Sequence, residues 1–295
     1  MNLCLTCFCL VYLCPPSFIP SPLSSSLGII AGSGVYPLLL ARSARAAGVE
    51  HIVVAAFEKE TDPALAALAD EVGWMRVGQL GRLLGFFEKR GLTRAIMAGQ
   101  IAPKNLFDLR PDLKALLLLG KLRERNAETL FGAIADELAR VGVDLLPATT
   151  YLEHLLAAPG LLAGPTPGRR AWADVEFAMR IAKQTSALDI GQSVVVRHGT
   201  VLAVEAFEGT DAAVRRGGAL AGGKGGATLG KVSKPRQDLR FDVPVIGPRT
   251  LETAAEARLS VIAVEAGKTL LLEREAIAAL ADRHRISVVG VEQKG

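Results

Sequence analysis

Short apolar runs alternate with amphipathic stretches along the chain from about residue 27 onward. Leu27–Ala31 and His51–Phe57 are almost continuous in apolar residues, which is typical of buried strands. Between them, Val35–Ala47 has a helical pattern and is followed by Gly48, a common helix stop. A strand, a glycine turn, a helix and a second strand make the βαβ unit of a parallel sheet.

The same alternation continues to residue 157 and predicts a Rossmann-like domain with a parallel sheet over residues 27–157. Further elements of this domain are expected at Trp74–Val77, Leu80–Arg90, Arg94–Ala98, Pro111–Leu122, Ala127–Val141 and Asp144–Leu146.

Proline and glycine dominate Ala158–Gly168, and this composition predicts a linker over residues 158–168. The pattern then restarts with a predicted helix at Trp172–Leu188 and a hairpin whose strands are Ser193–Arg197 and Val201–Ala206. We therefore expect a smaller, mixed α/β domain with the catalytic residues over residues 169–295. The fold class is α/β, in two domains.

The first 27 residues carry no charged side chain, and three prolines interrupt their short apolar part. Secretory signals have basic residues before a longer apolar stretch, and a membrane span needs about 20 apolar residues. Residues 1–26 are therefore predicted to be a disordered extension or sequence upstream of the natural start; a weak signal-anchor is the alternative. This segment holds all four cysteines, which excludes a disulfide framework or a thiol nucleophile in the body: Cys4, Cys7, Cys9 and Cys14.

The charge balance points to an anionic small ligand or an anionic membrane surface. The net charge is +4 over 295 residues, and aromatic residues make up 5% of the chain. A nucleic-acid-binding protein would need a stronger basic patch or aromatic stacking positions, so that class is not favoured.

The richest candidate chemistry lies in Lys231–Gly247, which holds two Lys, two Arg and two Asp. Pro235 and Pro244 prevent a regular helix, so the stretch is predicted to be a loop. Loops that concentrate both signs of charge are frequently sites, because cations hold phosphate oxygens while carboxylates hold Mg²⁺ or accept a proton from water. A solvated loop with surface ion pairs is the alternative.

Glycine is dense in the segment before this loop, Gly217–Gly230, which is expected to be mobile. The last residues of this segment and Lys231, Gly225–Lys231, match the first seven positions of the phosphate-binding loop of nucleoside triphosphatases. The eighth position is Val232 instead of Ser or Thr, and Pro235 prevents the helix that should follow. These two departures exclude an ATPase loop, although Lys231 can still bind phosphate.

A second candidate site follows the first predicted strand. Gly32-Ser33-Gly34 leads into a helix, whose N-terminus can bind an anion. Pro37 replaces the third glycine of the dinucleotide fingerprint, so a nicotinamide-dependent oxidoreductase stays only as an alternative, beside a tight turn without a ligand. Gly99-Gln100 is expected at the same carboxyl edge of the sheet.

Two motifs of the second domain combine carboxylates with other polar residues. Asp189 and Gln192 follow the first helix of that domain, which ordinary helix termination also explains. Thr210 and Asp211 begin a helix after a predicted strand, where they could bind a metal or ligand hydroxyls or simply cap the helix.

Taken in order, these motifs resemble those of the UDP-2,3-diacylglucosamine pyrophosphatases of the LpxI type. The resemblance covers residues 27 to nearly the end, and residues 1–26 have no counterpart in it. The motifs that carry it are Leu27–Gly34 with Pro37, Ala98–Gln100, Leu188–Gln192, Glu205–Asp211 and Lys231–Gly247.

The resemblance implies a hydrolase that cleaves the pyrophosphate of UDP-2,3-diacylglucosamine, in lipid A biosynthesis, to UMP and 2,3-diacylglucosamine 1-phosphate (lipid X). It implies attack at the β-phosphorus, Mg²⁺ as the cofactor, a homodimer, and work at the cytoplasmic face of the inner membrane. A non-catalytic protein that binds a nucleotide or a UDP-lipid is a further alternative.

The resemblance also implies residue roles. Asp242 is the expected essential aspartate, and Asp242 and Asp211 are expected metal ligands. The expected substrate contacts are Gly32, Ser33, Gly34, Gly99, Gln100, Asp189, Gln192, Thr210, Asp211, Lys231 and Lys234.

Overall fold

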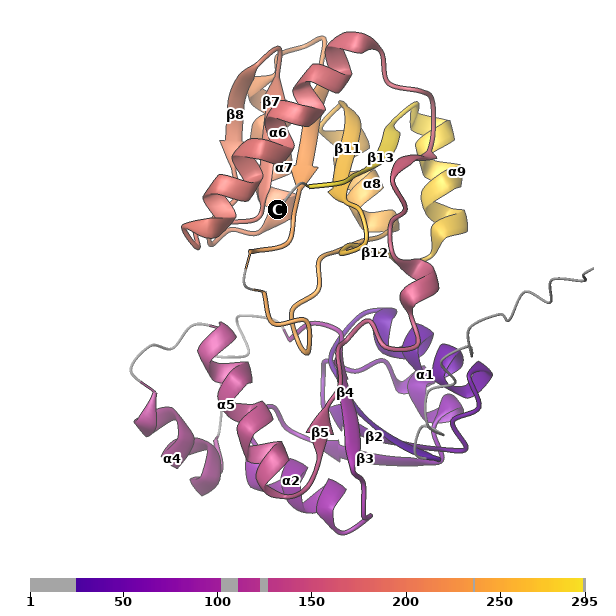
Figure 1. Cartoon of the computed structure of the whole chain (residues 1–295), viewed down its shortest axis with the longest axis vertical. Coiled ribbons are helices and arrows are strands. Elements are labelled where there is room, and N and C mark those ends of the chain that lie inside the picture. The colour runs from indigo at the N-terminus through magenta and orange to yellow at the C-terminus, as the bar shows by residue number, and fades with distance from the viewer. Residues whose placement is uncertain (1–24, 102–110, 123–126, 236, 294–295) are drawn as a thin grey trace, which may run out of the picture.

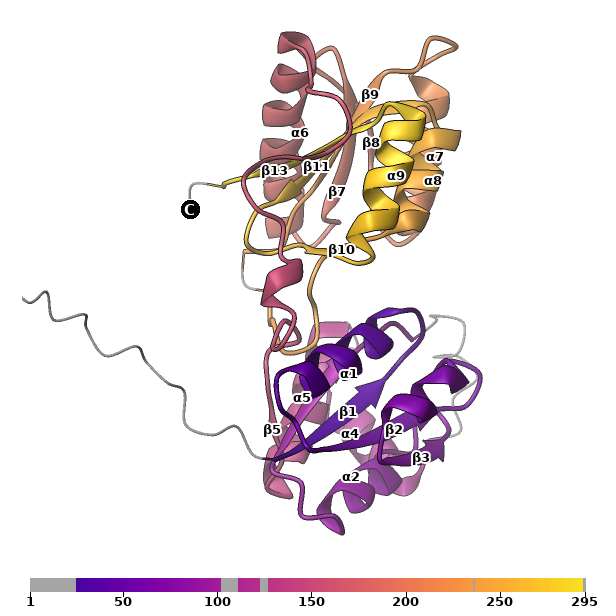
Figure 2. The ribbon, with the colours of Figure 1, turned by 90° about the vertical axis from the view of Figure 1, so that its right-hand side faces the viewer.

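The computed structural model describes residues 25–101, 111–122, 127–235 and 237–293. Within these ranges the chain forms two lobes, each built on its own sheet, one above the other in Figures 1 and 2. The predicted extension at residues 1–26, with its cysteines, lies outside the described residues except for Ser25 and Ser26.

The sheet of the N-terminal lobe is fully parallel, with the strand order β3-β2-β1-β4-β5. The predicted Rossmann-like domain is therefore confirmed. Its strands are mostly apolar after a polar first residue, because helices cover both faces of the sheet. They are β1 (Ser26–Ala31), β2 (His51–Phe57), β3 (Glu71–Met75), β4 (Arg94–Ala98) and β5 (Asp144–Leu145).

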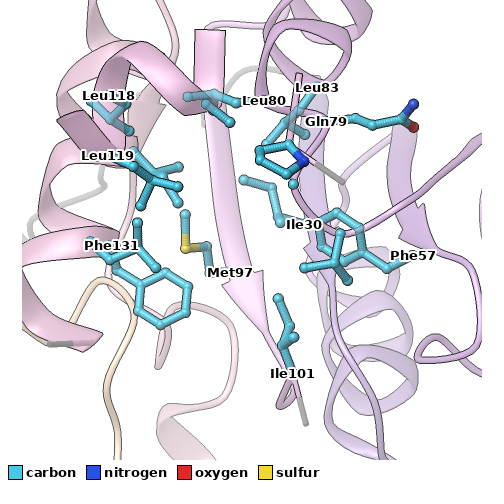
Figure 3. A pocket seen from close by; sticks show the side chains of 16 residues that line it. Ile30, Phe57, Gln79, Leu80, Leu83, Met97, Ile101, Leu118, Leu119 and Phe131 are labelled. Carbon is cyan, nitrogen blue, oxygen red and sulfur yellow. The ribbon is translucent and has the colours of Figure 1, made fainter. Parts of the chain in front are cut away.

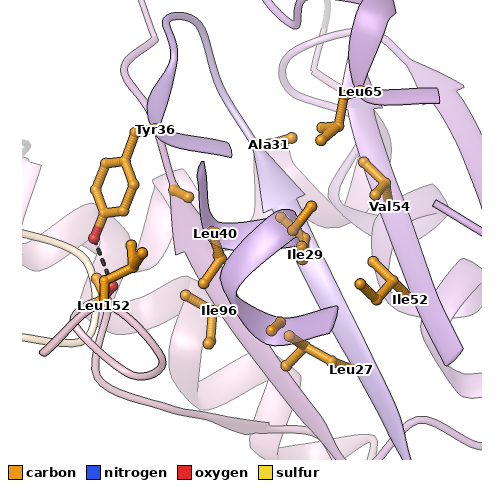
Figure 4. Close-up of a cluster of buried hydrophobic side chains, with 14 of the residues drawn as sticks. Leu27, Ile29, Ala31, Tyr36, Leu40, Ile52, Val54, Leu65, Ile96 and Leu152 are labelled. Carbon is orange, nitrogen blue, oxygen red and sulfur yellow. Dashed lines mark hydrogen bonds between the residues drawn. The ribbon is translucent and has the colours of Figure 1, made fainter. Parts of the chain in front are cut away.

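Two apolar clusters, one on each face, hold this lobe together. On the first face, α1 (Tyr36–Ala46) packs Leu40 against Ile29 and Ile52 of the sheet (Figure 4). The second face is covered by α2 (Leu80–Glu88), α4 (Leu113–Lys121) and α5 (Ala127–Arg140). The 3₁₀ turns η1 (Pro63–Leu68) and η2 (Glu153–Leu155) complete the lobe.

The C-terminal lobe has a six-stranded mixed sheet in the order β6-β13-β11-β9-β7-β8. Its strands β9, β11 and β13 run parallel, while β7 is antiparallel to both β8 and β9. The predicted mixed α/β architecture is confirmed. The strands are β6 (Gly160–Ala163), β7 (Ser193–Arg197), β8 (Thr200–Val204), β9 (Ala227–Lys231), β11 (Leu259–Glu265) and β13 (Ser287–Val291).

Helices lie on both faces of this second sheet (Figure 2). On one face α6 (Arg169–Ala187) buries Val175, Met179 and Ala182. The other face carries α7 (Thr210–Leu220), α8 (Pro248–Glu256) and α9 (Arg274–His284).

One prediction from composition was wrong. The predicted linker at residues 158–168 contains β6, which pairs antiparallel with β13 and forms an edge of the sheet. The glycine-rich segment Gly217–Gly230 begins in α7 and ends in β9, with turns over residues 221–226 between them, and its mobility stays a prediction. Gly217 is required there because a Cβ atom would lie 2.6 Å from the Val195 side chain.

Segments of the C-terminal half also complete the N-terminal lobe. The short strands β10 (Val245–Ile246) and β12 (Leu270–Leu271) pair in parallel, and Leu270 forms a bridge with Leu156. Leu270 and Leu272 are buried in the core cluster that α1 covers. The loop between β9 and β10 therefore crosses from one lobe to the other (Figure 1).

Candidate functional site

The candidate site begins at the carboxyl end of β9, where Lys231 is the last strand residue and is 9% exposed. The neighbouring strand β7 starts here, with Ser193 opposite Lys231, and the backbone N–H of Val232 donates to the Gln192 carbonyl (3.0 Å). Glu205 follows β8 at the same edge, and its N–H donates to the Ser193 carbonyl (2.8 Å). The antiparallel arrangement of β7 thus brings three distant polar segments together.

Thr210 connects the side chains of this edge. The Lys231 ammonium donates to the Thr210 hydroxyl (3.2 Å), which donates to Glu205 Oε1 (2.8 Å). The Oε2 atom of Glu205 and the Oε1 atom of Gln192 are buried without a partner among the described residues. Buried polar atoms are nearly always hydrogen-bonded, so these two mark a place where a ligand or water supplies the partner.

The ammonium of Lys231 lies in an unusual electrostatic environment. Burial lowers the pKa of Lys231, and the negative charges of Glu205, Asp211 and Asp242 oppose this effect. An anionic group of a ligand next to Lys231 would stabilise its charged form. The position therefore suits phosphate binding, as the sequence predicted.

Glu265, at the end of β11, fixes the backbone just beyond Lys231. Its side chain is almost fully buried, and its Oε2 atom accepts hydrogen bonds from the backbone N–H (2.9 Å) and the hydroxyl (3.0 Å) of Ser233. Lys183 donates to both Glu265 oxygens and to the Ser233 carbonyl (2.9 Å). Burial raises the pKa of Glu265, but hydrogen bonds from Lys268, Lys183 and Ser233 outweigh it and the pKa is lowered.

The sequence analysis missed Glu265. The available signal was a carboxylate that ends an otherwise apolar strand, Leu259–Glu265, but a charged residue at a strand end is common in any sheet. Only the register of β11 against β9 brings Glu265 to Ser233. Glu205, part of a predicted motif but absent from the predicted contacts, is the second residue that the geometry adds.

Lys234 joins the predicted residue Asp189 to the loop. The Lys234 ammonium forms an ion pair with the Asp189 carboxylate, and the Lys234 backbone N–H donates to Gln237 Oε1 (2.7 Å). Burial lowers the pKa of Lys234, but the hydrogen bond and charge of Asp189, with the charge of Asp242, outweigh it and the pKa is raised.

Asp242 lies half-buried where the two lobes meet. Burial raises its pKa, while the polar side chain of Gln237 and the positive charges of Lys234 and Lys231 oppose the rise. Next to it, Phe241 packs against Phe131 of α5, with ring centroids 5.6 Å apart. Asp242 is therefore held by the N-terminal lobe and faces the lysines of the C-terminal lobe.

The second aspartate of the loop has a local role. Asp238 and Arg240 form an ion pair (2.6 Å), and the Asp238 carbonyl accepts the backbone N–H of Asp242 (3.0 Å). The backbone N–H of Ala148 also donates to the Leu239 carbonyl (2.7 Å), which ties the loop to the N-terminal lobe.

The two predicted metal ligands differ in what they contact. Asp211, in the first turn of α7, lies 2.8 Å from the Arg249 guanidinium, so its carboxylate already has a cationic partner. No group of three or more His, Cys, Asp or Glu side chains that could hold a metal ion occurs in the described ranges. Mg²⁺ commonly takes only one or two protein carboxylates and fills its shell with water and substrate phosphates. Asp242 fits that mode, whereas Asp211 is engaged with Arg249.

The predicted glycine turn of the N-terminal lobe is locked to the second predicted turn. The Ser33 N–H donates to the Gln100 carbonyl (2.7 Å), and the Gln100 N–H donates to the Ser33 carbonyl (3.2 Å). A Cβ atom on Gly32 would lie 2.5 Å from the Gln100 oxygen, so the close crossing of the two turns requires this glycine. Gly99 adopts a φ of +91° where the two turns cross. Gly34 is exposed and lies just before α1.

The turn nevertheless retains the form of an anion site. Val35 stands at the N-cap of α1 without a side-chain hydrogen bond to the helix. The first N–H groups of α1 thus receive no side-chain cap, and they lie at the carboxyl edge of the parallel sheet. The predicted residues hence form two groups, one at this edge and one around Lys231.

Comparison with known proteins agrees with this two-lobe layout. The family model of the LpxI N-terminal domain matches residues 26–155, and that of the LpxI C-terminal domain matches residues 158–289. The chain is 34% identical over 276 residues to the UDP-2,3-diacylglucosamine pyrophosphatase LpxI of Caulobacter vibrioides, which covers 90% of this chain and 97% of that protein.

Among solved structures, the biotin carboxylase domain of Hydrogenobacter thermophilus 2-oxoglutarate carboxylase matches 59% of this chain and 35% of that chain. Its identity is 16% and its TM-score is 0.25, too low to carry any argument. The family models and the relative together cover both lobes and the loop between them. The chain belongs to the LpxI family.

Proposed function

We propose that this chain is a UDP-2,3-diacylglucosamine pyrophosphatase that uses Asp242, Lys231 and Lys234 to hydrolyse its substrate to UMP and lipid X. The observation that carries the proposal is the grouping of polar side chains at the carboxyl end of β9. Lys231 is buried there against Thr210, Lys234 is paired with Asp189, and two buried atoms, Glu205 Oε2 and Gln192 Oε1, have no partner among the described residues. Family membership supplies the substrate, because the relative from Caulobacter vibrioides carries that activity in its name.

The two lysines stabilise negative charge on the diphosphate. Hydrolysis of a phosphoanhydride develops charge on the phosphoryl oxygens and on the bridging oxygen, and catalysis depends mainly on neutralising that charge and positioning the water. Lys231 is fixed by Thr210, and Lys234 by Asp189. Their ammonium groups are thus pre-positioned, with little reorganisation left for the reaction.

Asp242 acts on the attacking water. A carboxylate whose pKa is raised by burial is a stronger base than an exposed aspartate and accepts a proton as the water attacks. The oxygen of the water forms a bond to the β-phosphorus, and the bond from that phosphorus to the bridging oxygen breaks. UMP leaves with the electron pair, and ¹⁸O from labelled water is expected in lipid X.

Mg²⁺ is the proposed cofactor. One carboxylate oxygen of Asp242 would hold it, with water and the substrate phosphates as further ligands, and the other oxygen would accept the proton of the attacking water. The chemistry that a bound Mg²⁺ supplies is neutralisation and polarisation of the phosphoryl oxygens. EDTA should stop hydrolysis and added Mg²⁺ should restore it. Full turnover in EDTA would remove Mg²⁺ from the proposal while leaving the lysines in place.

The remaining predicted residues are proposed as substrate contacts. Gln192, Thr210 and Asp211 line the edge around Lys231. The interlocked turns of the N-terminal lobe, with Gly34 leading towards α1, are proposed to bind another part of the UDP-lipid. A substrate held between both groups would span the two lobes.

We also propose that the protein works at the cytoplasmic face of the inner membrane. Three leucines on α4 are strongly exposed, with Leu113 at 74%, and Lys121 ends the helix. An apolar helix face flanked by a cation suits an anionic lipid surface. In the part of the chain that the structure describes, no helix has the length and apolar character to cross a membrane. The homodimer stays a prediction.

The alternatives predict different results in one binding assay. A nicotinamide-dependent oxidoreductase would bind NADH, which is measured by the change in nicotinamide fluorescence, and we expect no binding. A non-catalytic UDP-lipid-binding protein would bind UDP-2,3-diacylglucosamine without releasing UMP. Release of UMP from this substrate by the purified chain supports the proposal, and its absence with intact binding would contradict it.

A further inference from the structure

The N-terminal lobe contains an apolar cavity that the chemistry at Asp242 does not use. Its volume is about 110 Å³, and it lies between one face of the sheet and α2, α4 and α5 (Figure 3). Among the described residues that line it, only Gln79 has a polar side chain. That amide points away from the cavity in Figure 3, and its Oε1 accepts the Arg76 N–H (2.9 Å).

The cavity is partly open among the described residues, and its lining offers water almost no hydrogen bonds. Such an apolar site favours an apolar ligand over water. Since a water-sized group needs about 10–15 Å³ of such space, the cavity admits about seven to eleven groups of methylene size. This capacity corresponds to a substantial length of an alkyl chain.

The cavity lies next to the loop between β9 and β10, which carries Lys234 and Asp242 and is called the catalytic loop below. Met97 and Phe57 line it from the carboxyl ends of β4 and β2, the edge that also carries the interlocked turns. From the other side it is lined by Phe131, whose ring contacts Phe241, the neighbour of Asp242. The charge of Glu128, one turn before Phe131, also reaches Asp242. The cavity therefore lies one aromatic contact away from the reacting groups.

We infer that this cavity binds the distal part of one acyl chain of the lipid substrate and sets the preference for acyl-chain length. The inference rests on the proposed function. The helix that closes the cavity supports it, because α4 places Ala115 and Leu119 against the cavity and exposes Leu116 on its other side. The helix α4 therefore presents apolar side chains both to the cavity and to the surface that is proposed to meet the bilayer.

Two substitutions change the cavity in opposite directions. Ala115→Phe fills it, Leu119→Ala enlarges it, and Leu116→Phe on the exposed face of α4 is the matched control. The assay compares kcat/KM for UDP-2,3-diacylglucosamine with long chains and with both chains shortened by about four methylenes; each buried methylene changes affinity about fourfold. Binding of the two corresponding diacylglucosamine 1-phosphates by calorimetry gives a readout without turnover.

The wild-type protein and L116F should prefer the long-chain substrate by about tenfold or more. A115F should lose most of that preference by losing the long-chain substrate, while L119A should extend it to still longer chains. Equal use of both substrates by the wild type, or an unchanged preference in A115F and L119A, would overturn the inference but leave the hydrolase intact. No hydrolysis of either substrate by the wild type would instead overturn the proposed function. If A115F does not fold, the L119A comparison decides.

Discussion

Replacement of Glu265 by Gln tests how the catalytic loop is held. The substitution keeps the size of the side chain and removes its charge. Glu265 is 1% exposed, and its carboxylate accepts hydrogen bonds from Ser233 and ion pairs from Lys183 and Lys268. A glutamine offers one acceptor oxygen instead of two and turns two N–H donors towards groups that are themselves donors. The variant should therefore lose both stability and loop position.

The structure sets the size of the loss. Removing one partner of a buried ion pair costs about 3–5 kcal/mol, because the other charge is left uncompensated. The side chains of Lys183 and Lys268 are 25% and 48% exposed, so both can recover some hydration. The free energy of unfolding should consequently fall by about 3 kcal/mol, at the lower end of that range. For a chain of this size the melting temperature should fall by about 6–12 °C.

Urea unfolding and kcat/KM on the same sample measure the two effects. Because Ser233 lies between Lys231 and Lys234, we expect kcat/KM to fall about tenfold or more, the scale on which misplaced charge-stabilising groups act. Lys268→Gln is the control: its ion pair is half-exposed and should be worth at most about 1 kcal/mol. A Glu265→Gln variant with unchanged stability and unchanged kcat/KM would refute this role of Glu265.

Three further predictions follow from single residues. The acid limb of kcat/KM against pH should lie above the usual range of an aspartate, because burial raises the pKa of Asp242. Gln237→Leu removes a polar side chain that lowers this pKa, so the limb should move to higher pH, and a shift to lower pH would contradict the assignment. Lys231→Met should abolish turnover, because it removes a cation proposed to hold the phosphates. It also leaves the buried Glu205 carboxylate without its cationic neighbour, so thermal unfolding should show some loss of stability; turnover close to that of the wild type would contradict the role of Lys231. Gly99→Ala should cost about 1–3 kcal/mol, because φ is +91° and a Cβ atom would lie 2.6 Å from a backbone oxygen, whereas Gly85→Ala in the open middle of α2 should be neutral or stabilising by up to about 1 kcal/mol; equal effects in urea unfolding would contradict this explanation.

Periodicity predicted both sheets because strands such as Leu27–Ala31 and Ser193–Arg197 are apolar runs with clear glycine boundaries. It failed at β6, where Gly160–Ala163 lies among prolines and glycines. An edge strand needs only one neighbour, so it tolerates a composition that would break a central strand. Nothing in the sequence indicates that this segment pairs with β13.

The site could be predicted only in part for a similar reason. Residue types that bind phosphate and take up protons are visible in the sequence, and they point to the Lys231–Gly247 stretch as a whole. The choice of Asp242 within it comes from the resemblance to the LpxI family. The residues that hold them are ordinary in the sequence: Glu265 ends a strand, and Glu205 precedes a helix. Their roles depend on strand register and on burial, and neither is encoded in a short motif.

The glycine turn shows the opposite case. Gly32 was predicted as a ligand contact, and the structure gives it a purely structural reason, the close approach of the Gln100 backbone. The close approach of the two backbones explains Gly32 without a ligand. Around Lys231, by contrast, the buried atoms Glu205 Oε2 and Gln192 Oε1 lack a partner among the described residues.

The most direct test of the central claim is hydrolysis of UDP-2,3-diacylglucosamine by the wild-type chain and by Asp242→Asn, with substrate binding measured on both. The wild type should release UMP and lipid X. The variant should bind the substrate within a few-fold of the wild type and lose turnover by about 10²–10⁴-fold, the usual effect of removing a general base. Turnover by Asp242→Asn close to that of the wild type would contradict the account of this site.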